Sequence, residues 1–134
     1  MKGGCLCGAV RYEIVAEPLG TTYCHCEDCR RASGAPVVVW TFFTSGSIVY
    51  QNEKPRFIDF AKRQRSFCPH CGTPISFYDP AIPHLIEVTT CSLDDADKLI
   101  PSNHCWTTDQ LSWFQTNDDL PRFDYLAPLP QQEP

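Results

Sequence analysis

The chain has 134 residues, with 11 lysines and arginines against 16 aspartates and glutamates, and a formal net charge of -5. This length suits one domain, and the negative balance with scattered basic residues argues against nucleic-acid binding, which needs a basic face. No run approaches the ~18 apolar residues of a membrane span, and no apolar stretch precedes the first cysteine, so we expect a cytoplasmic protein without a membrane partner.

The polar and apolar residues follow mostly the pattern of β-strands. Residues 10–16 alternate between apolar and polar side chains, as in a strand with one buried face. Residues 36–43 form a short apolar run rich in β-branched and aromatic side chains, which suits a buried strand. No amphipathic helical pattern of ten or more residues competes with these segments, so we expect an all-β fold. Further strands are predicted at Ser47–Gln51, Arg56–Lys62, Pro74–Tyr78 and Leu85–Cys91.

Helical structure is expected only in short turns. One begins at residues 26–28, where acidic residues occupy the first turn, and Gly34 is placed to end it. A second could lie at residues 92–97, where the sequence suits a loop almost as well. The proline-rich residues 127–134 are expected to form an extended tail after a single domain of residues 1–126.

Seven of the nine cysteines fall in three short clusters. Thiols stay reduced in the cytoplasm, and an odd total fits a fully paired disulfide framework poorly, so we favour metal ligands over disulfides. Seven thiolates are too many for one tetrahedral zinc and one short of two closed sites, which predicts two zinc ions per chain, one with four thiolates and one with three. The clusters are Cys5 with Cys7, Cys24 with Cys26 and Cys29, and Cys68 with Cys71.

Glycine distinguishes two of these clusters from the third. Gly8 and Gly72 each follow the second cysteine of a pair, where glycine permits the positive φ of a tight knuckle whose N–H groups point at the sulfurs. Two knuckles make one closed structural site. In the remaining triplet, residues two apart in an extended segment share a face, and Cys29 returns to that face if the chain turns helical after Cys26. We call Cys5, Cys7, Cys68 and Cys71 the four-thiol cluster, and Cys24, Cys26 and Cys29 the three-thiol cluster.

The three-thiol cluster keeps one coordination position free unless a distant side chain fills it. Histidine is the common fourth partner of three cysteines, so a closed structural site is the competing interpretation, with His104 as the leading ligand. His25 and His70 lie inside the cysteine motifs, where we expect them to turn outward. Cys91 and Cys105 stand alone in apolar settings and are expected to be core residues. The full set of candidate fourth ligands is His25, His70, His84, His104 and Cys105.

The chain contains, in order, the segments GCLCGAVRY (4–12), CHCEDCRRASGAP (24–36) and FCPHCGTP (67–74). Near its end it contains HCW (104–106) and DDLPRF (118–123). These segments and their separations closely resemble the glutathione-dependent formaldehyde-activating enzyme family, also called the centromere protein V family. The similarity extends over nearly the whole chain.

The resemblance implies a fold of several coiled, mainly antiparallel sheets, with a structural zinc on the four-thiol cluster and a catalytic zinc on the three-thiol cluster. It also implies carbon–sulfur lyase chemistry, in which glutathione and formaldehyde form S-hydroxymethylglutathione. The expected partners are therefore a small thiol and a small aldehyde. One difference from the family is Cys105, which stands where an apolar residue is usual between the matching His and Trp.

The charge of the three-thiol site suits sulfur chemistry better than water activation. Zinc with three thiolates carries a formal charge of about -1, so it is a weak Lewis acid but a suitable place to hold a substrate thiolate beside a carbonyl group. A fourth anionic ligand calls for positive charge nearby. Arg30 and Arg31 follow Cys29 directly and are candidates for this role, although an exposed pair would contribute little. His104 and Trp106 are the other candidate substrate-binding residues.

Two hypotheses of different classes follow. The first is a zinc-dependent carbon–sulfur lyase that acts on a small thiol adduct. The second is a zinc-stabilised binding module with a protein partner, in which the three-thiol site is closed. A fourth ligand supplied by solvent or by a thiol favours the enzyme, whereas His104 as fourth ligand favours the module.

Overall fold

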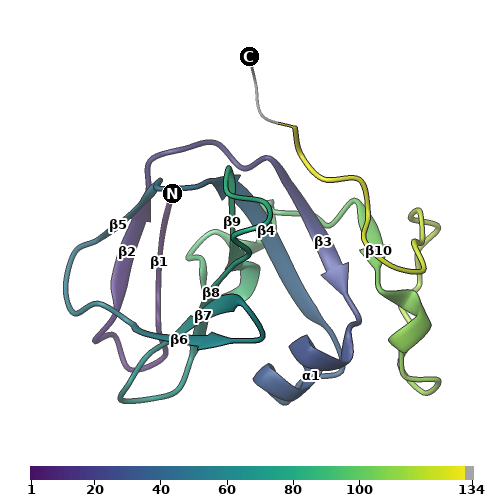
Figure 1. Ribbon diagram of the computed structural model, residues 1–134, viewed down its shortest axis with the longest axis horizontal. Helices are drawn as coiled ribbons and strands as arrows, with labels where there is room; N and C mark the ends of the chain where they lie inside the picture. The colour runs from purple at the N-terminus through teal and green to yellow at the C-terminus, as the bar shows by residue number, and fades with distance from the viewer. Residues whose placement is uncertain (132–134) are drawn as a thin grey trace.

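The computed structural model describes residues 1–131, and residues 132–134 at the end of the expected tail lie outside the described part. The described residues form ten strands, one α-helix and three short 3₁₀ helices (Figure 1), which confirms the expected all-β class. None of these helices is long and apolar enough to cross a membrane. The elements are β1 (Lys2–Gly4), β2 (Arg11–Ile14), β3 (Gly20–Cys24), α1 (Glu27–Ser33), β4 (Val38–Thr44), β5 (Ile48–Tyr50), β6 (Arg56–Phe60), β7 (Arg63–Phe67), β8 (Pro74–Tyr78), β9 (Leu85–Thr89), η1 (Thr90–Ser92), η2 (Ala96–Lys98), β10 (Asn103–Cys105) and η3 (Thr107–Asp109).

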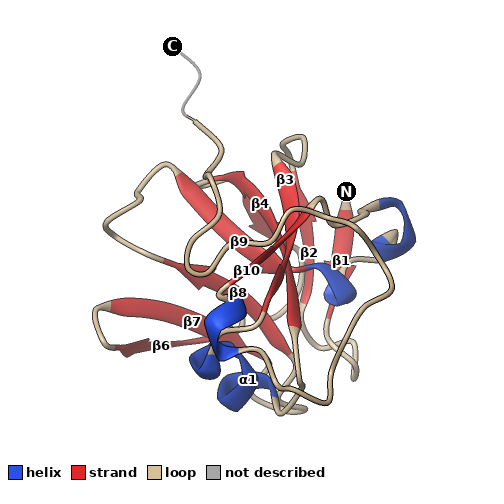
Figure 2. Cartoon of the chain, turned by 90° about the vertical axis from the view of Figure 1, so that its right-hand side faces the viewer, coloured by secondary structure: helices blue, strands red, loops and turns tan. Residues whose placement is uncertain are grey.

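The strands are arranged in two sheets. A three-stranded sheet has the order β1-β2-β5, and a seven-stranded sheet has the order β10-β3-β4-β9-β8-β7-β6. All neighbouring strands are antiparallel except β10 and β3, which are parallel. Figure 2 shows the long sheet with helix α1 near one end of its strands.

Each of the six predicted strand segments overlaps a strand, and β8 has the predicted bounds. Strand β6 ends earlier than expected, at Phe60, because Ala61 and Lys62 take positive φ angles of 50° and 63° in the tight turn to β7. Strands β1, β3, β7 and β10 were not predicted from the sequence. They are short and rich in glycine, threonine or charged residues, so their pairing with neighbouring strands decides their conformation.

The main hydrophobic core lies between the two sheets. Tyr12 and Ile14 from β2 belong to the same buried cluster as Phe43, Ile75 and Val88 from the long sheet. Because side chains alternate along a strand, the residues between these core positions point to the opposite face of the long sheet. That opposite face carries a second cluster of buried side chains, which includes the three-thiol cluster.

The second cluster contains Cys24, Cys29, Val38, Trp40 and Cys105, all buried. Ala127 is also buried within this cluster, so the chain after residue 126 packs against the sheet where it enters the expected tail. Residues 126–130 close one side of a cavity of about 200 Å³ that Thr22, Phe42 and Cys105 also line. The face of the sheet away from the main core therefore combines sulfur ligands, aromatic side chains and a cavity.

Candidate functional site

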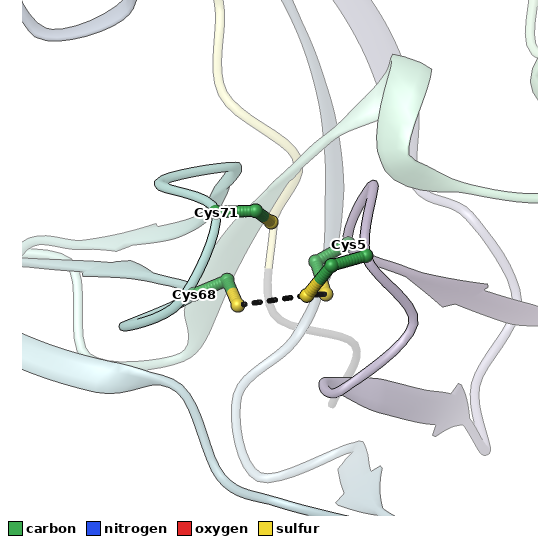
Figure 3. Close-up of side chains that lie close together, drawn as sticks. Cys5, Cys68 and Cys71 are labelled. Carbon is green, nitrogen blue, oxygen red and sulfur yellow. Dashed lines mark hydrogen bonds between the residues drawn. The ribbon is translucent and has the colours of Figure 1, made fainter.

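The four-thiol cluster joins the β1–β2 connection to the β7–β8 connection. Its four Sγ atoms lie within 4.8 Å of one another, with 3.6 Å between Cys5 and Cys7 and 3.8 Å between Cys7 and Cys68. Sulfurs around a tetrahedral zinc lie about 3.8 Å apart, whereas bonded sulfurs lie about 2 Å apart, so these distances fit a metal site and not a disulfide. Figure 3 shows Cys68 and Cys71 directed from their turn toward Cys5.

Both knuckles have the backbone conformation that their glycines predicted. Gly8 and Gly72 have φ angles of 82° and 76°. The N–H of Gly8 donates to the carbonyl of Cys5 (3.2 Å), and the N–H of Gly72 donates to the carbonyl of Cys68 (2.9 Å). The N–H of Val10 donates to Cys5 Sγ (3.2 Å). The two tight turns and the N–H of Val10 thus hold the cysteines in fixed positions, which suits a structural metal.

The three-thiol cluster is built where β3 passes into α1. Cys24 ends the strand, Cys26 caps the helix, and the N–H of Cys29 donates to Cys26 Sγ (3.2 Å). The three Sγ atoms lie within 4.8 Å of one another, with 3.7 Å between Cys24 and Cys29. Hydrogen bonds from Cys24 and Cys26 lower the pKa of Cys29, and the charge of Arg65 lowers it further. The donor set and its spacing fit zinc, which prefers thiolates at tetrahedral spacing.

Arg65 is a charged neighbour of this cluster that the sequence did not reveal. Its Nη2 donates to Cys29 Sγ at 3.8 Å, and its guanidinium group lies 4.8 Å from the centre of the Phe77 ring. The aromatic face holds the guanidinium in place through a cation–π contact. Arg65 therefore supplies a fixed positive charge beside a thiolate-rich site.

The arginines expected beside the cluster are directed elsewhere. Arg30 donates from Nη1 to the carbonyl of Asp109 (3.1 Å), and Arg31 is exposed and pairs with Glu27 (2.9 Å). Neither forms a hydrogen bond to a thiol of the cluster. Trp106 is half-buried at the edge of the second cluster.

His104 is completely buried, and both of its ring nitrogens are engaged. Its Nδ1 shares a hydrogen bond with Nε2 of His25 (2.8 Å), and its Nε2 lies 3.0 Å from Oδ1 of Asp118. A histidine needs a free ring nitrogen to bind a metal, so this geometry leaves none for the three-thiol cluster. His70 is exposed and pairs with Glu53, as its expected outward position requires.

His25 differs from its expected outward position, because it is completely buried against His104. It follows Cys24 in the chain, so its side chain points away from the thiols, but the rings of His104 and Phe114 pack against it on that side. Burial above all, together with the neighbouring His104, lowers the pKa of His25 to about 4. The pair therefore fixes the segment that carries the thiols.

Cys105 lies directly opposite Cys24 in the parallel pair of β10 and β3 and is buried, as expected for a core residue. A hydrogen bond with Cys24 lowers the pKa of Cys105. Its sulfur is nevertheless outside the group of three whose atoms all lie within 4.8 Å. The expectation that Cys91 is a core residue is wrong, because the 3₁₀ turn η1 leaves it exposed.

Comparison with known proteins agrees with this site. A family model described as glutathione-dependent formaldehyde-activating enzyme matches residues 1–109. The chain belongs to this family. The resemblance found in the sequence motifs is thereby confirmed, and the family match includes both thiol clusters.

Two curated relatives and one solved structure are similar to this family member. An uncharacterised lyase of Schizosaccharomyces pombe is 28% identical over 76 residues, which cover 57% of this chain and 56% of the relative. A putative glutathione-dependent formaldehyde-activating enzyme of Halomonas elongata is 26% identical over 103 residues, which cover 70% of this chain and 66% of the relative. Both matches span less than two thirds of the relative's own length. A crystal structure of a Rhodobacter sphaeroides protein, 26% identical, matches with a TM-score of 0.59 over 71% of this chain and 89% of that one.

Proposed function

We propose that the protein is a zinc-dependent carbon–sulfur lyase that forms and cleaves small thiol adducts, with S-hydroxymethylglutathione, from glutathione and formaldehyde, as the leading substrate. The three-thiol cluster would hold the catalytic zinc and the four-thiol cluster the structural zinc. A zinc ion on three thiolates supplies a fourth position at which a substrate sulfur is held as thiolate. The names of the family and of the Halomonas elongata relative support the choice of thiol and aldehyde.

The observation that carries this proposal is the engagement of His104. Its two ring nitrogens contact His25 and Asp118, so the histidine that would have closed the three-thiol site is committed elsewhere. A site of three thiolates without this fourth ligand suits an incoming thiol. This supports the enzyme over the alternative of a binding module with a closed metal site.

The surroundings of the three-thiol cluster also support thiol chemistry. Arg65 offsets the negative charge that a fourth thiolate would add, and its contact with Cys29 fixes that charge at the site. Trp40 and Phe77 lie on the same face of the sheet, with ring centres 6.0 Å apart, and provide an apolar wall. Such a wall limits access of water to a reactive aldehyde. Reduced thiols are required throughout, so we place the protein in the cytoplasm.

Exchange-spectroscopy NMR tests the proposal on the zinc-loaded protein with glutathione and formaldehyde. The wild type should accelerate exchange between glutathione and its hydroxymethyl adduct above the uncatalysed rate. Cys26→Ser should lose this acceleration, whereas Cys91→Ser, which alters an exposed thiol outside both clusters, should keep it. If all three proteins match the uncatalysed rate, the glutathione–formaldehyde assignment is wrong. If, in addition, no thiol alters the spectrum of a cobalt-substituted sample, the binding module replaces the enzyme.

A further inference from the structure

Glu87 is a carboxyl group that strand β9 directs toward the face with the three-thiol cluster. It lies opposite Phe42 of β4 on one side and Phe77 of β8 on the other, and Phe77 lies opposite Arg65 of β7. Residues directly opposite one another in antiparallel strands share a face. The four side chains therefore form one row across the sheet, and Arg65 at its end contacts Cys29.

The surroundings of this carboxyl group differ from those of a surface glutamate. Glu87 is half-buried, and neither a hydrogen bond nor an ion pair fixes its carboxyl group among residues 1–131. Burial above all, together with the charges of Cys29, Cys105 and Asp79, raises its pKa to about 8, and the charge of Arg65 opposes this shift. A carboxyl group that changes protonation near neutral pH can both accept and donate a proton there.

We propose that Glu87 is the proton carrier of this site: its carboxylate takes the proton of the incoming thiol, and the resulting carboxylic acid delivers that proton to the aldehyde oxygen. The inference rests on the function proposed above, because it assigns an acid–base group to the same reaction. It gives a role to a charged side chain that a buried sheet face would otherwise disfavour.

The step balances without any further reactant. The thiol proton passes to the Glu87 carboxylate, and the sulfur electron pair forms the new carbon–sulfur bond. The π electron pair of the carbonyl group moves to its oxygen, which takes the proton from the Glu87 carboxyl group. A thiol and formaldehyde thus give the hydroxymethyl thioether, and Glu87 ends ionised, as it began. In the cleavage direction the same proton moves in reverse.

The buried acid–base groups next to the three-thiol cluster are engaged in the structure. His25 and His104 hydrogen-bond to each other, and Asp118 lies against His104. The carboxylate of Asp109 accepts the backbone N–H of Glu27 (3.1 Å). Asp28, on helix α1 between two of the thiols, is exposed to solvent, whereas Glu87 is a half-buried carboxyl group on the sheet face without a hydrogen-bond partner among the described residues.

The first test compares Glu87→Gln with Glu17→Gln, a matched change of an exposed glutamate. Both zinc-loaded variants and the wild type are studied by exchange-spectroscopy NMR with glutathione and formaldehyde. Glu87→Gln should lose about 10²-fold or more of the exchange rate above background, because an amide cannot carry the proton. Its metal content and glutathione affinity should equal those of the wild type, and Glu17→Gln should be unchanged throughout.

The second test measures stability and does not depend on turnover. The pKa of Glu87 in the folded protein, about 8, lies above its ordinary value of 4.5, so the folded state binds more protons between these values. Wild-type stability should therefore carry a contribution that falls as pH rises through this window. The urea midpoint of Glu87→Gln should rise relative to the wild type between pH 5 and pH 9, by amounts that Glu17→Gln does not show.

The outcomes separate this inference from the function on which it rests. Wild-type protein that fails to accelerate exchange overturns the proposed function and the proton role together. An active wild type with a Glu87→Gln variant of equal rate overturns the proton role alone. A slow Glu87→Gln variant that has also lost glutathione affinity assigns Glu87 to binding and overturns the proton role. The proton role is also overturned if the difference in urea midpoint between Glu87→Gln and the wild type does not change with pH.

Discussion

The two thiol clusters have the same ligand chemistry but different surroundings. Around the four-thiol cluster the neighbours are backbone N–H groups, two knuckle glycines and the hydroxyl of Thr73, which lies 3.2 Å from Cys71 Sγ. Around the three-thiol cluster they are ionisable or aromatic side chains, among them Arg65, Trp40 and, along the same face, Glu87. The first set suits a metal alone, whereas the second also supplies the groups that the proposed reaction with a substrate requires.

On the proposed assignment, the number of thiolates alone does not define a catalytic metal site. Backbone donors stabilise thiolates but offer no group that changes charge or grips a ligand. A sheet face presents side chains from several strands to one point, so it can add a cation, an aromatic wall and a carboxyl group to a metal site. The predictions below test this contrast, beginning with the largest expected effect.

The four-thiol cluster should determine whether the domain folds. Cys68→Ser should lose stability comparable with the whole folding free energy, about 5–15 kcal/mol, because a structural metal contributes directly to folding. Cys26→Ser should lose one metal and keep the fold. Circular dichroism melting with metal analysis measures both effects, and Cys91→Ser is the control. Equal loss of structure in Cys68→Ser and Cys26→Ser would make the contrast between the clusters untenable.

Arg65 should affect thiol binding more than folding. Arg65→Gln removes the charged donor beside Cys29, and we expect thiol affinity to fall by about 1.5–3 kcal/mol. Titration of a cobalt-substituted sample with glutathione measures this affinity. Arg30→Gln serves as the control, because its guanidinium donates to Asp109 and not to a thiol. Equal affinities in both variants would show that the thiolate charge needs no partner at this position.

His104 should affect stability without affecting metal content. His104→Leu leaves the buried Nε2 of His25 without a partner, and we expect a loss of about 1–3 kcal/mol in the free energy of unfolding. Urea denaturation measures this loss, and His70→Leu, which alters an exposed histidine, is the control. A variant at His104 that binds one zinc fewer than wild type would restore this histidine as a ligand.

The smallest effect is expected at the exposed end of helix α1. Arg31→Ala breaks an ion pair with Glu27 whose partners are 79% and 56% exposed. Exposed pairs four residues apart on a helix contribute about 0.3–0.5 kcal/mol, so stability should change by no more than this. Thiol affinity should stay at the wild-type value. A clear loss of thiol affinity in Arg31→Ala would return this arginine to the substrate site.

The sequence predicted what depends on neighbours along the chain. The spacing of the cysteines, the glycine after each pair and the helical turn before Gly34 are local features, and the structure groups the same thiols within 4.8 Å. Arg65 could not be predicted, because β7 lacks an apolar pattern and only its pairing with β8 brings this side chain to Cys29. Glu87 gave one signal, since it interrupts an otherwise apolar strand. Because Glu87 is far along the chain from the three-thiol cluster, the sequence did not indicate that it lies on the same face as these thiols.

The distribution of thiols along the chain has a consequence for the order in which the protein would acquire the two proposed zinc ions. The three-thiol cluster spans residues 24–29, so its ligands can gather around an ion as soon as this short segment leaves the ribosome. The four-thiol cluster must wait until Cys71 has been made, because its halves are separated by the loop from Cys7 to Cys68. We expect the three-thiol cluster to bind its zinc ion before the four-thiol cluster does during synthesis. Stalled nascent chains ending before residue 68 should already bind one zinc per chain, and a chain of that length without zinc would reverse the order.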